Sequence, residues 1–172
     1  MSMSPDPNAP TFRPTETLPE PVRVLLKGFH TVTTLPVQWG DQDAFGHVNN
    51  VIYFRWFESA RIDLLNACPS NVTMAGEGLG PILASIQCDY KKQLRFPDVI
   101  SIGSRVTRIG RSSVDLGHSI ISHQQGQVIA EGRCVIVVFD YTHQRVTRIP
   151  DDLRAAFEHS MQISGGEERA SS

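Results

Sequence analysis

The sequence predicts an α+β domain in which one long helix packs against a curved antiparallel sheet. Residues 51–65 place apolar side chains at helical spacing around most of the segment, which is typical of a helix that other structure encloses. After Pro81 the chain consists of β-branched runs, several of them alternating apolar with polar residues, and short turns separate four of these runs. One helix followed by consecutive strands favours an antiparallel meander with the helix on one face.

Both ends of the chain are expected to lie outside this domain. Residues 1–28 contain six prolines, spread among polar residues between positions 5 and 21. Such a composition buries too little apolar surface to offset its ordering entropy. We therefore predict a mobile arm, with packing on a partner subunit as the alternative. Residues 161–172 are predicted to be a flexible tail, which leaves residues 29–160 as the folded domain.

Within the domain the elements follow from local signals. Residues 29–39 form the first predicted strand, and Asn49 or Asn50 is a good N-cap for the helix that follows. The Gly-rich residues 69–80 are expected to form a loop that is free to border a pocket. The later strands are predicted over residues 82–90, 99–109, 113–123 and 128–141, with a short terminal helix over 150–161.

Composition narrows the functional classes. The formal net charge of −2 gives no argument for nucleic acid or an anionic membrane surface, and no apolar run approaches a membrane span of about 20 residues. No secretory signal is recognised at the start of the chain. The cysteines are odd in number and lack close-pair spacing, so we expect reduced thiols in a cytoplasmic protein. They are Cys68, Cys88 and Cys134.

The stretch before the helix carries the residues most suited to chemistry. Asp43 lies just ahead of the start of a buried helix, where free N–H groups can hold a polarised carbonyl oxygen. Asp41, two residues earlier, is expected to have a structural role by accepting hydrogen bonds from backbone N–H groups. Gly46 is expected to allow close backbone approach or a positive φ.

Residues 40–53, Gly-Asp-Gln-Asp-Ala-Phe-Gly-His-Val-Asn-Asn-Val-Ile-Tyr, resemble the signature of the 4-hydroxybenzoyl-CoA thioesterase family and its acyl-CoA thioesterase relatives. The motif is an Asp-x-Asp, a glycine three positions later and a His-Val-Asn-Asn helix start. The resemblance implies the hotdog fold, in which a curved sheet wraps a central helix. It also implies an enzyme that hydrolyses an acyl-CoA thioester to a free acid and CoA without a metal or other cofactor. Members of this family are homodimers or homotetramers, built as dimers of dimers, that bind acyl-CoA at a subunit interface.

The resemblance also implies the roles of individual residues. Asp43 matches the catalytic carboxylate, which acts as a nucleophile or as a base that activates water. The backbone N–H near Asn50 matches the group that polarises the thioester carbonyl, and Gly46 belongs to the same catalytic set. His47 is expected to hold a water or the thiolate, or else to be a residue at the helix start that is hydrogen-bonded to backbone.

Substrate contacts are expected from Tyr53 on the helix and from Arg111 and Ser112, which lie near the position that contacts the nucleotide in this family. Glu58 is a helix carboxylate, but arginines at i−3 and i+3 favour an ion pair on the surface. Basic side chains that are candidates for the CoA phosphates, or else simply solvated, are Lys91, Lys92, Arg95, Arg105, Arg108 and Arg111.

The sequence leaves three alternatives to an acyl-CoA thioesterase. In the first, the substrate is an acyl carrier protein thioester. In the second, the protein binds acyl-CoA or an acyl carrier without turnover, and in the third it is a hotdog hydratase or dehydratase of enoyl thioesters. The hydratase requires an acid paired with histidine in a different motif, and that spacing is not found in the sequence. His47-Val48-Asn49-Asn50 replaces the more aromatic helix start of the aromatic-substrate enzyme, so the acyl group stays open.

Overall fold

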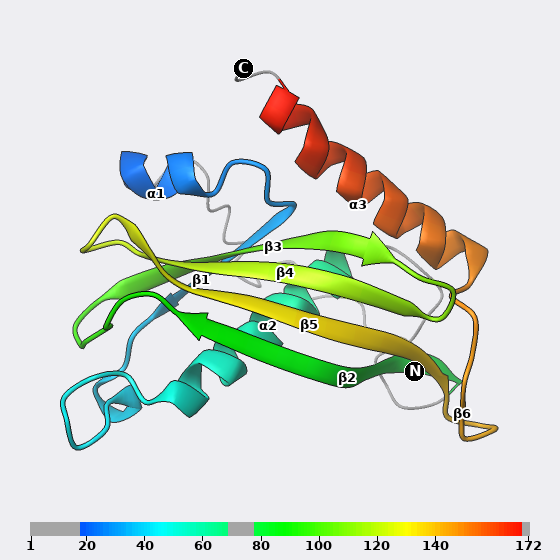
Figure 1. Cartoon of the computed structure of the whole chain (residues 1–172), viewed down its shortest axis with the longest axis horizontal. Coiled ribbons are helices and arrows are strands. Elements are labelled where there is room, and N and C mark those ends of the chain that lie inside the picture. The colour runs from blue at the N-terminus through cyan, green and yellow to red at the C-terminus, as the bar shows by residue number, and fades with distance from the viewer. Residues whose placement is uncertain (1–17, 69–77, 170–172) are drawn as a thin grey trace, which may run out of the picture.

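The computed structural model describes residues 18–68 and 78–169, with side chains described up to residue 162. Its elements follow the predicted order of strand, long helix, further strands and terminal helix (Figure 1). They are α1 (Glu20–Leu25), β1 (Thr31–Pro36), a 3-10 turn (Trp39–Asp41), α2 (Asn50–Ala67), β2 (Leu79–Tyr90), β3 (Val99–Ile109), β4 (Ser113–Ser122), β5 (Gln127–Asp140), β6 (Arg145–Val146) and α3 (Asp151–Arg169).

The strands form one antiparallel sheet that curves around α2, as the predicted α+β class requires (Figure 1). The strand order is β1-β3-β4-β5-β2, and the short β6 pairs with the end of β5. The predicted meander is therefore right for β3, β4 and β5 but wrong for β2, which pairs with β5 and lies at an edge. Residues 91–98 connect β2 across the end of the sheet to β3.

Helix α2 begins as the sequence predicts. Asn49 is the N-cap, and its side-chain oxygen accepts a hydrogen bond from the N–H of Val51 (3.1 Å). One face of the helix is buried against the sheet, whereas Val51 is 54% and Ile62 39% exposed. The expected enclosure of the helix is thus incomplete within one chain. The buried helix residues are Ile52, Tyr53, Trp56, Phe57, Ala60 and Leu64.

Two glycines identify the two faces of the sheet. A Cβ on Gly132 would lie 2.5 Å from the Phe57 ring of α2, so Gly132 is on the inner face that the helix covers. A Cβ on Gly103 would lie 2.5 Å from the ring of Phe29, which precedes β1. In the strand register, Gly103 and Gly132 belong to adjacent rows of residues across the sheet, and the side chains of adjacent rows point to opposite faces. Phe29 therefore covers the outer face.

The ends of the chain differ from the prediction. Within residues 1–28, residues 20–25 form α1, whose Val22 and Leu26 are buried against Ile121 at the outer face. This packing is a tertiary effect that the Pro-rich composition does not reveal. The terminal helix α3 continues to Arg169 instead of ending near 161, so residues 161–169 are helix and not a tail.

Helix α3 completes the core at the far end of α2. Its Leu153 and Phe157 pack in one buried cluster with Leu64 of α2 and Val106 of β3. Strand β1 pairs with β3 only up to Ser104, so α3 contacts β3 beyond the end of that pairing. The predicted loop over residues 69–80 falls mostly outside the described residues, which resume at residue 78.

Candidate functional site

The loop between β1 and α2 is closed by backbone hydrogen bonds. The N–H of Asn49 donates to the carbonyl of Asp41 (2.8 Å), and the N–H of Asp43 donates to the carbonyl of His47 (2.8 Å). Gly46 lies inside this loop with a φ of +73°, a conformation that favours glycine. The predicted positive φ is therefore confirmed. The loop holds Asp43 near its tip and leads directly into α2.

Asp41 has the structural role that the sequence predicts. Its Oδ2 accepts a hydrogen bond from the N–H of Gln38 (2.8 Å) and so caps the 3-10 turn at Trp39–Asp41. The carboxylate is thereby committed to the backbone at the start of the loop. Asp41 consequently makes a matched control for any experiment on Asp43.

The two carboxylate oxygens of Asp43 have different surroundings. Oδ1 accepts a hydrogen bond from the N–H of Phe45 (2.8 Å) and a longer one from the N–H of His47 (3.4 Å). Oδ2 accepts no hydrogen bond from any described residue. One oxygen therefore fixes the side chain to the turn, while the other is available to a substrate or water. A turn-shaping role and a catalytic role are compatible in this arrangement.

The start of α2 presents an N–H group in the same region. The N–H groups of Val51 and Ile52 donate to the Oδ1 and the carbonyl oxygen of Asn49 (3.1 and 3.0 Å). Among the described residues, no acceptor meets the N–H of Asn50. The helix start adds its partial positive charge at this position. The group that the resemblance assigns to the thioester carbonyl is thus free to donate.

The His47 side chain has a partner that neither of its predicted roles includes. Its Nε2 lies 2.9 Å from Nη2 of Arg95, in the connection between β2 and β3. Because a guanidinium only donates, Nε2 is the acceptor and the ring proton of the neutral imidazole is on Nδ1. Nε2 is therefore engaged with Arg95 and not with backbone. The sequence shows Arg95 only as one of several basic residues, since this contact depends on the tertiary fold.

A small pocket of about 300 Å³ lies beside the helix start. Tyr90, at the end of β2, donates a hydrogen bond from its hydroxyl to the carbonyl of Asn50 (3.1 Å). Its ring meets that of Tyr53 edge to face, with ring centroids 5.0 Å apart. Tyr90 has no signal in the sequence that marks it for the site. The lining residues are His47, Val48, Asn50, Tyr53, Tyr90, Lys91, Lys92, Gln93 and Leu94.

Both tyrosines keep their protons at physiological pH. Burial raises the pKa of Tyr53 to about 12 and that of Tyr90 to about 12, with smaller effects from Cys88. Tyr90 is therefore a constant hydrogen-bond donor to the helix start.

The structure thus brings His47, Asn50 and Tyr53 together, and Asp43 adjoins them through the loop without lining the pocket itself.

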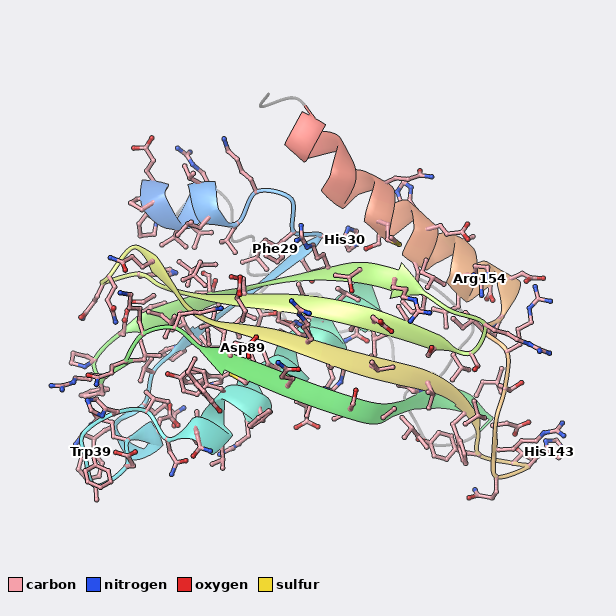
Figure 2. The ribbon with its side chains drawn as sticks, viewed as in Figure 1. Phe29, His30, Trp39, Asp89, His143 and Arg154 are labelled. Atoms are coloured by element: carbon pink, nitrogen blue, oxygen red, sulfur yellow. The ribbon has the colours of Figure 1, made fainter. Side chains whose placement is uncertain are left out.

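Arg111 and Ser112 lie at the other end of the sheet, in the turn between β3 and β4. Arg111 lines a separate cavity with Arg148 and Arg154, and Nη2 of Arg154 donates to the carbonyl of Gly110 (2.6 Å). Figure 2 shows Arg154 far from Trp39, which marks the end where α2 begins. The predicted nucleotide contacts are therefore not joined to the predicted catalytic residues within one chain.

Other predicted features have simple outcomes. Glu58 lies 3.8 Å from Nη2 of Arg61, so the predicted ion pair on the helix is confirmed. Across the described parts of the chain, no three His, Cys, Asp or Glu side chains are grouped to hold a metal ion. Within the same parts of the chain, no helix combines the length and the apolar character needed to cross a bilayer.

Residues 37–157 match the Thioesterase-like superfamily, and the chain belongs to this family. The matched region runs from the end of β1 through α2 and the sheet to Phe157 in α3. It therefore contains the loop with Asp43, the helix start at Asn50 and the pocket beside it. The hotdog fold and the assignment as a thioesterase, both expected from the sequence, are confirmed.

Individual relatives agree with this class. The chain is 25% identical to the long-chain acyl-CoA thioesterase FadM of Escherichia coli over 130 residues, which are 76% of this chain and 98% of FadM. It is 26% identical to the chloroplastic acyl-acyl carrier protein thioesterase ATL3 of Arabidopsis thaliana, over 78% of this chain and 70% of that protein. The crystal structure of the PA5185 protein of Pseudomonas aeruginosa matches with a TM-score of 0.67 at 31% identity, covering 77% of this chain and 92% of that one.

Proposed function

We propose that this thioesterase hydrolyses acyl-CoA, with Asp43 as the catalytic carboxylate and the N–H of Asn50 as the donor to the thioester carbonyl. The proposal rests on two groups, near the tip and at the end of one closed loop, that are both free to interact with a substrate. Oδ2 of Asp43 and the N–H of Asn50 have no partner among the described residues. FadM, a relative over nearly its whole length, supports acyl-CoA as the substrate class.

The chemistry follows from these two groups. Oδ2 attacks the thioester carbon, which gives an acyl anhydride and releases CoA thiolate, and water then hydrolyses the anhydride. In the alternative, Oδ2 takes a proton from a water that attacks the same carbon. Negative charge develops on the carbonyl oxygen in both routes, and the N–H of Asn50 stabilises it at the positive end of the α2 dipole.

The experiment that tests this proposal measures thiol release from short, long and aromatic acyl-CoAs. The Asp43→Asn variant keeps the Oδ1 acceptor for the turn but loses the charge, so we expect turnover to fall by about 10²–10⁴-fold. Asp41→Asn, the matched change in the same loop, is expected to retain turnover. Wild-type turnover in Asp43→Asn would refute the mechanism.

The same assay separates the rival functions. Acyl-CoA binding without thiol release by the wild-type protein would favour a binding protein. Consumption of an enoyl-CoA without thiol release would favour a hydratase. Activity confined to acyl carrier protein thioesters would place the substrate with that of ATL3, the relative named above.

We also propose that the enzyme is a homodimer, or a tetramer made of such dimers. Strand β2 is an edge strand whose only described strand partner is β5, and its Leu83 and Tyr90 are 40% and 47% exposed. An edge of 12 residues invites pairing with a second copy. In a dimer the nucleotide of a CoA bound at one helix start is proposed to contact Arg111 and Ser112 of the other chain.

The three free thiols fit a cytoplasmic location.

Light scattering tests the dimer. The wild-type chain is expected at two or four times the monomer mass, and Leu83→Lys should shift it toward the monomer because a charge on an edge strand opposes pairing. Val146→Lys, which changes a similarly exposed residue on β6 (51%), should leave the mass unchanged. A monomeric wild-type protein at micromolar concentration would contradict the proposal.

A further inference from the structure

The outer face of the sheet carries a row of two arginines with a glycine between them. In the strand register, Arg133 of β5 is opposite Gly117 of β4, and Gly117 is opposite Arg105 of β3. Neighbouring strands are about 4.8 Å apart, so the two arginine Cα atoms are separated by about 10 Å. Both arginines and Gly117 line one cavity of about 600 Å³.

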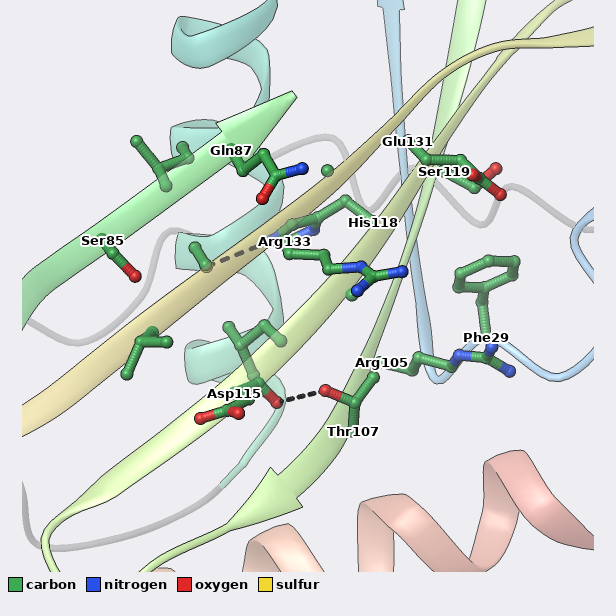
Figure 3. A pocket seen from close by; sticks show the side chains of 16 residues that line it. Phe29, Ser85, Gln87, Arg105, Thr107, Asp115, His118, Ser119, Glu131 and Arg133 are labelled. Carbon is green, nitrogen blue, oxygen red and sulfur yellow. Dashed lines mark hydrogen bonds between the residues drawn. The ribbon is translucent and has the colours of Figure 1, made fainter. Parts of the chain in front are cut away.

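Gly117 leaves open the space between the two arginines. A Cβ at this position would lie 3.0 Å from the Cγ2 of Thr107, and the next neighbour is a side-chain carbon of Arg105 at 4.0 Å. Figure 3 shows Arg133 extending from β5 across β4, toward the side of the cavity that holds Arg105 and Phe29. The Arg105 guanidinium lies 5.2 Å from the centre of the Phe29 ring. Two cationic forks therefore border one gap in the sheet surface.

The acidic residues of this cavity have partners of their own. Glu131 pairs with Lys91 (3.1 Å), and Asp115 pairs with Arg108 (3.8 Å). By contrast, the side chain of Arg133 makes no ion pair or hydrogen bond with any other described residue. Two like charges that share a cavity favour binding of an anion between them.

We propose that the Arg105–Gly117–Arg133 row binds the oxyanion group of a small ligand, a phosphate or a carboxylate. Guanidinium groups match both anions through paired N–H donors. The adjacent Ser119, whose hydroxyl lies one row away on the same face, adds a further donor. This site is on the outer face, so it is separate from the pocket at the start of α2 and does not depend on the proposed function.

The test is calorimetric titration of the full-length protein with inorganic phosphate in one arm and octanoate in the other. We expect saturable binding of at least one probe, weakened tenfold or more in Arg133→Gln. Arg133→Lys keeps the charge but loses the fork and should fall between these two. Arg55→Gln is the matched control, because Arg55 is an exposed arginine on α2 that does not line this cavity.

Phosphate binding alone points to a phosphorylated ligand such as a nucleotide, and octanoate binding alone points to a carboxylate such as the free acid. The inference is overturned when neither probe binds, or when Arg133→Gln binds as tightly as the wild-type protein. Asp43→Asn should bind the probes normally, which separates this site from the catalytic one.

Discussion

At the scale of single residues, the hydroxyl of Tyr90 links the sheet to the catalytic end of α2. It donates to the carbonyl of Asn50, the residue whose N–H is proposed to polarise the substrate. Tyr90 touches the helix start and acts through Asn50, so it is a positioning residue. Its ring also borders the pocket, so the ring and the hydroxyl can be tested separately.

Tyr90→Phe removes the hydroxyl and keeps the ring. We expect kcat to fall about two- to tenfold with little change in KM, which corresponds to one hydrogen bond of about 0.5–1.5 kcal/mol. Tyr90→Leu should also raise KM because the pocket wall is lost. Tyr141→Phe removes a similar bond to the carbonyl of Pro81 (3.2 Å), and its kinetics should match the wild type. Equal effects of Tyr90→Phe and Tyr141→Phe would argue against a positioning role.

At the scale of elements, the contact between α2 and the sheet depends on the absence of a side chain at Gly132. The Phe57 ring occupies the space where a Cβ would stand, and it also stacks on the ring of His118, with centroids 5.3 Å apart. Phe57 is fully buried, so it has little freedom to move away.

Gly132→Ala should therefore lower the free energy of unfolding by about 1–3 kcal/mol through overpacking. Gly117→Ala is the control on the next strand, where the nearest contact is with the exposed Thr107, and it should change stability by less than about 0.5 kcal/mol. Urea unfolding of both variants measures the difference. Phe57→Leu in the Gly132→Ala background should recover part of the loss; without such recovery, the clash is not the cause.

Sequence reasoning succeeded where the controlling interactions are local. The N-cap at Asn49, the backbone bond to Asp41 and the ion pair of Glu58 involve residues within four positions of one another. It failed where partners are distant in sequence. Arg95 reaches His47 and Tyr90 reaches Asn50 only because residues 90–95 fold back beside the helix start.

The strand order and α1 were missed for the same reason. Nothing in residues 82–90 distinguishes pairing with β3 from pairing with β5, because both partners are alternating runs of similar length. The six residues of α1 are too short to be stable alone, and their order depends on Val22 packing against the sheet. Likewise, the open side of α2 reflects what a single chain leaves uncovered.

At the scale of the whole molecule, stability should depend on pH through His118. This histidine is buried, with Nδ1 2.8 Å from the hydroxyl of Ser104. Burial, and then the positive charge of Arg61, lower its pKa to about 4 from an ordinary value of 6.5. Between pH 6.5 and about pH 4, His118 is therefore protonated in the unfolded chain but stays neutral in the folded protein.

His118 should thus leave stability intact above pH 6.5 and reduce it as the pH falls toward 4. The expected loss from this residue is about 2 kcal/mol between pH 7 and pH 5. Urea unfolding of the wild type at both pH values measures the total slope, and His118→Gln should remove this part of it. His143→Gln changes an exposed histidine and should keep the wild-type slope. An unchanged slope in His118→Gln would contradict the assignment.

The position of β2 in the sheet has a consequence for how the chain is made. Strand β2 precedes its partner β5 by almost 40 residues, and β3 and β4 must be added before the sheet can accept it. On the ribosome, α2 and β2 therefore emerge while the surface that covers them has not yet been synthesised. Their apolar faces stay open to water or to chaperones during this interval. The hairpins of β3, β4 and β5 then close quickly, and the docking of β2, which pairs over a longer sequence separation than either hairpin, should follow them as a slower event.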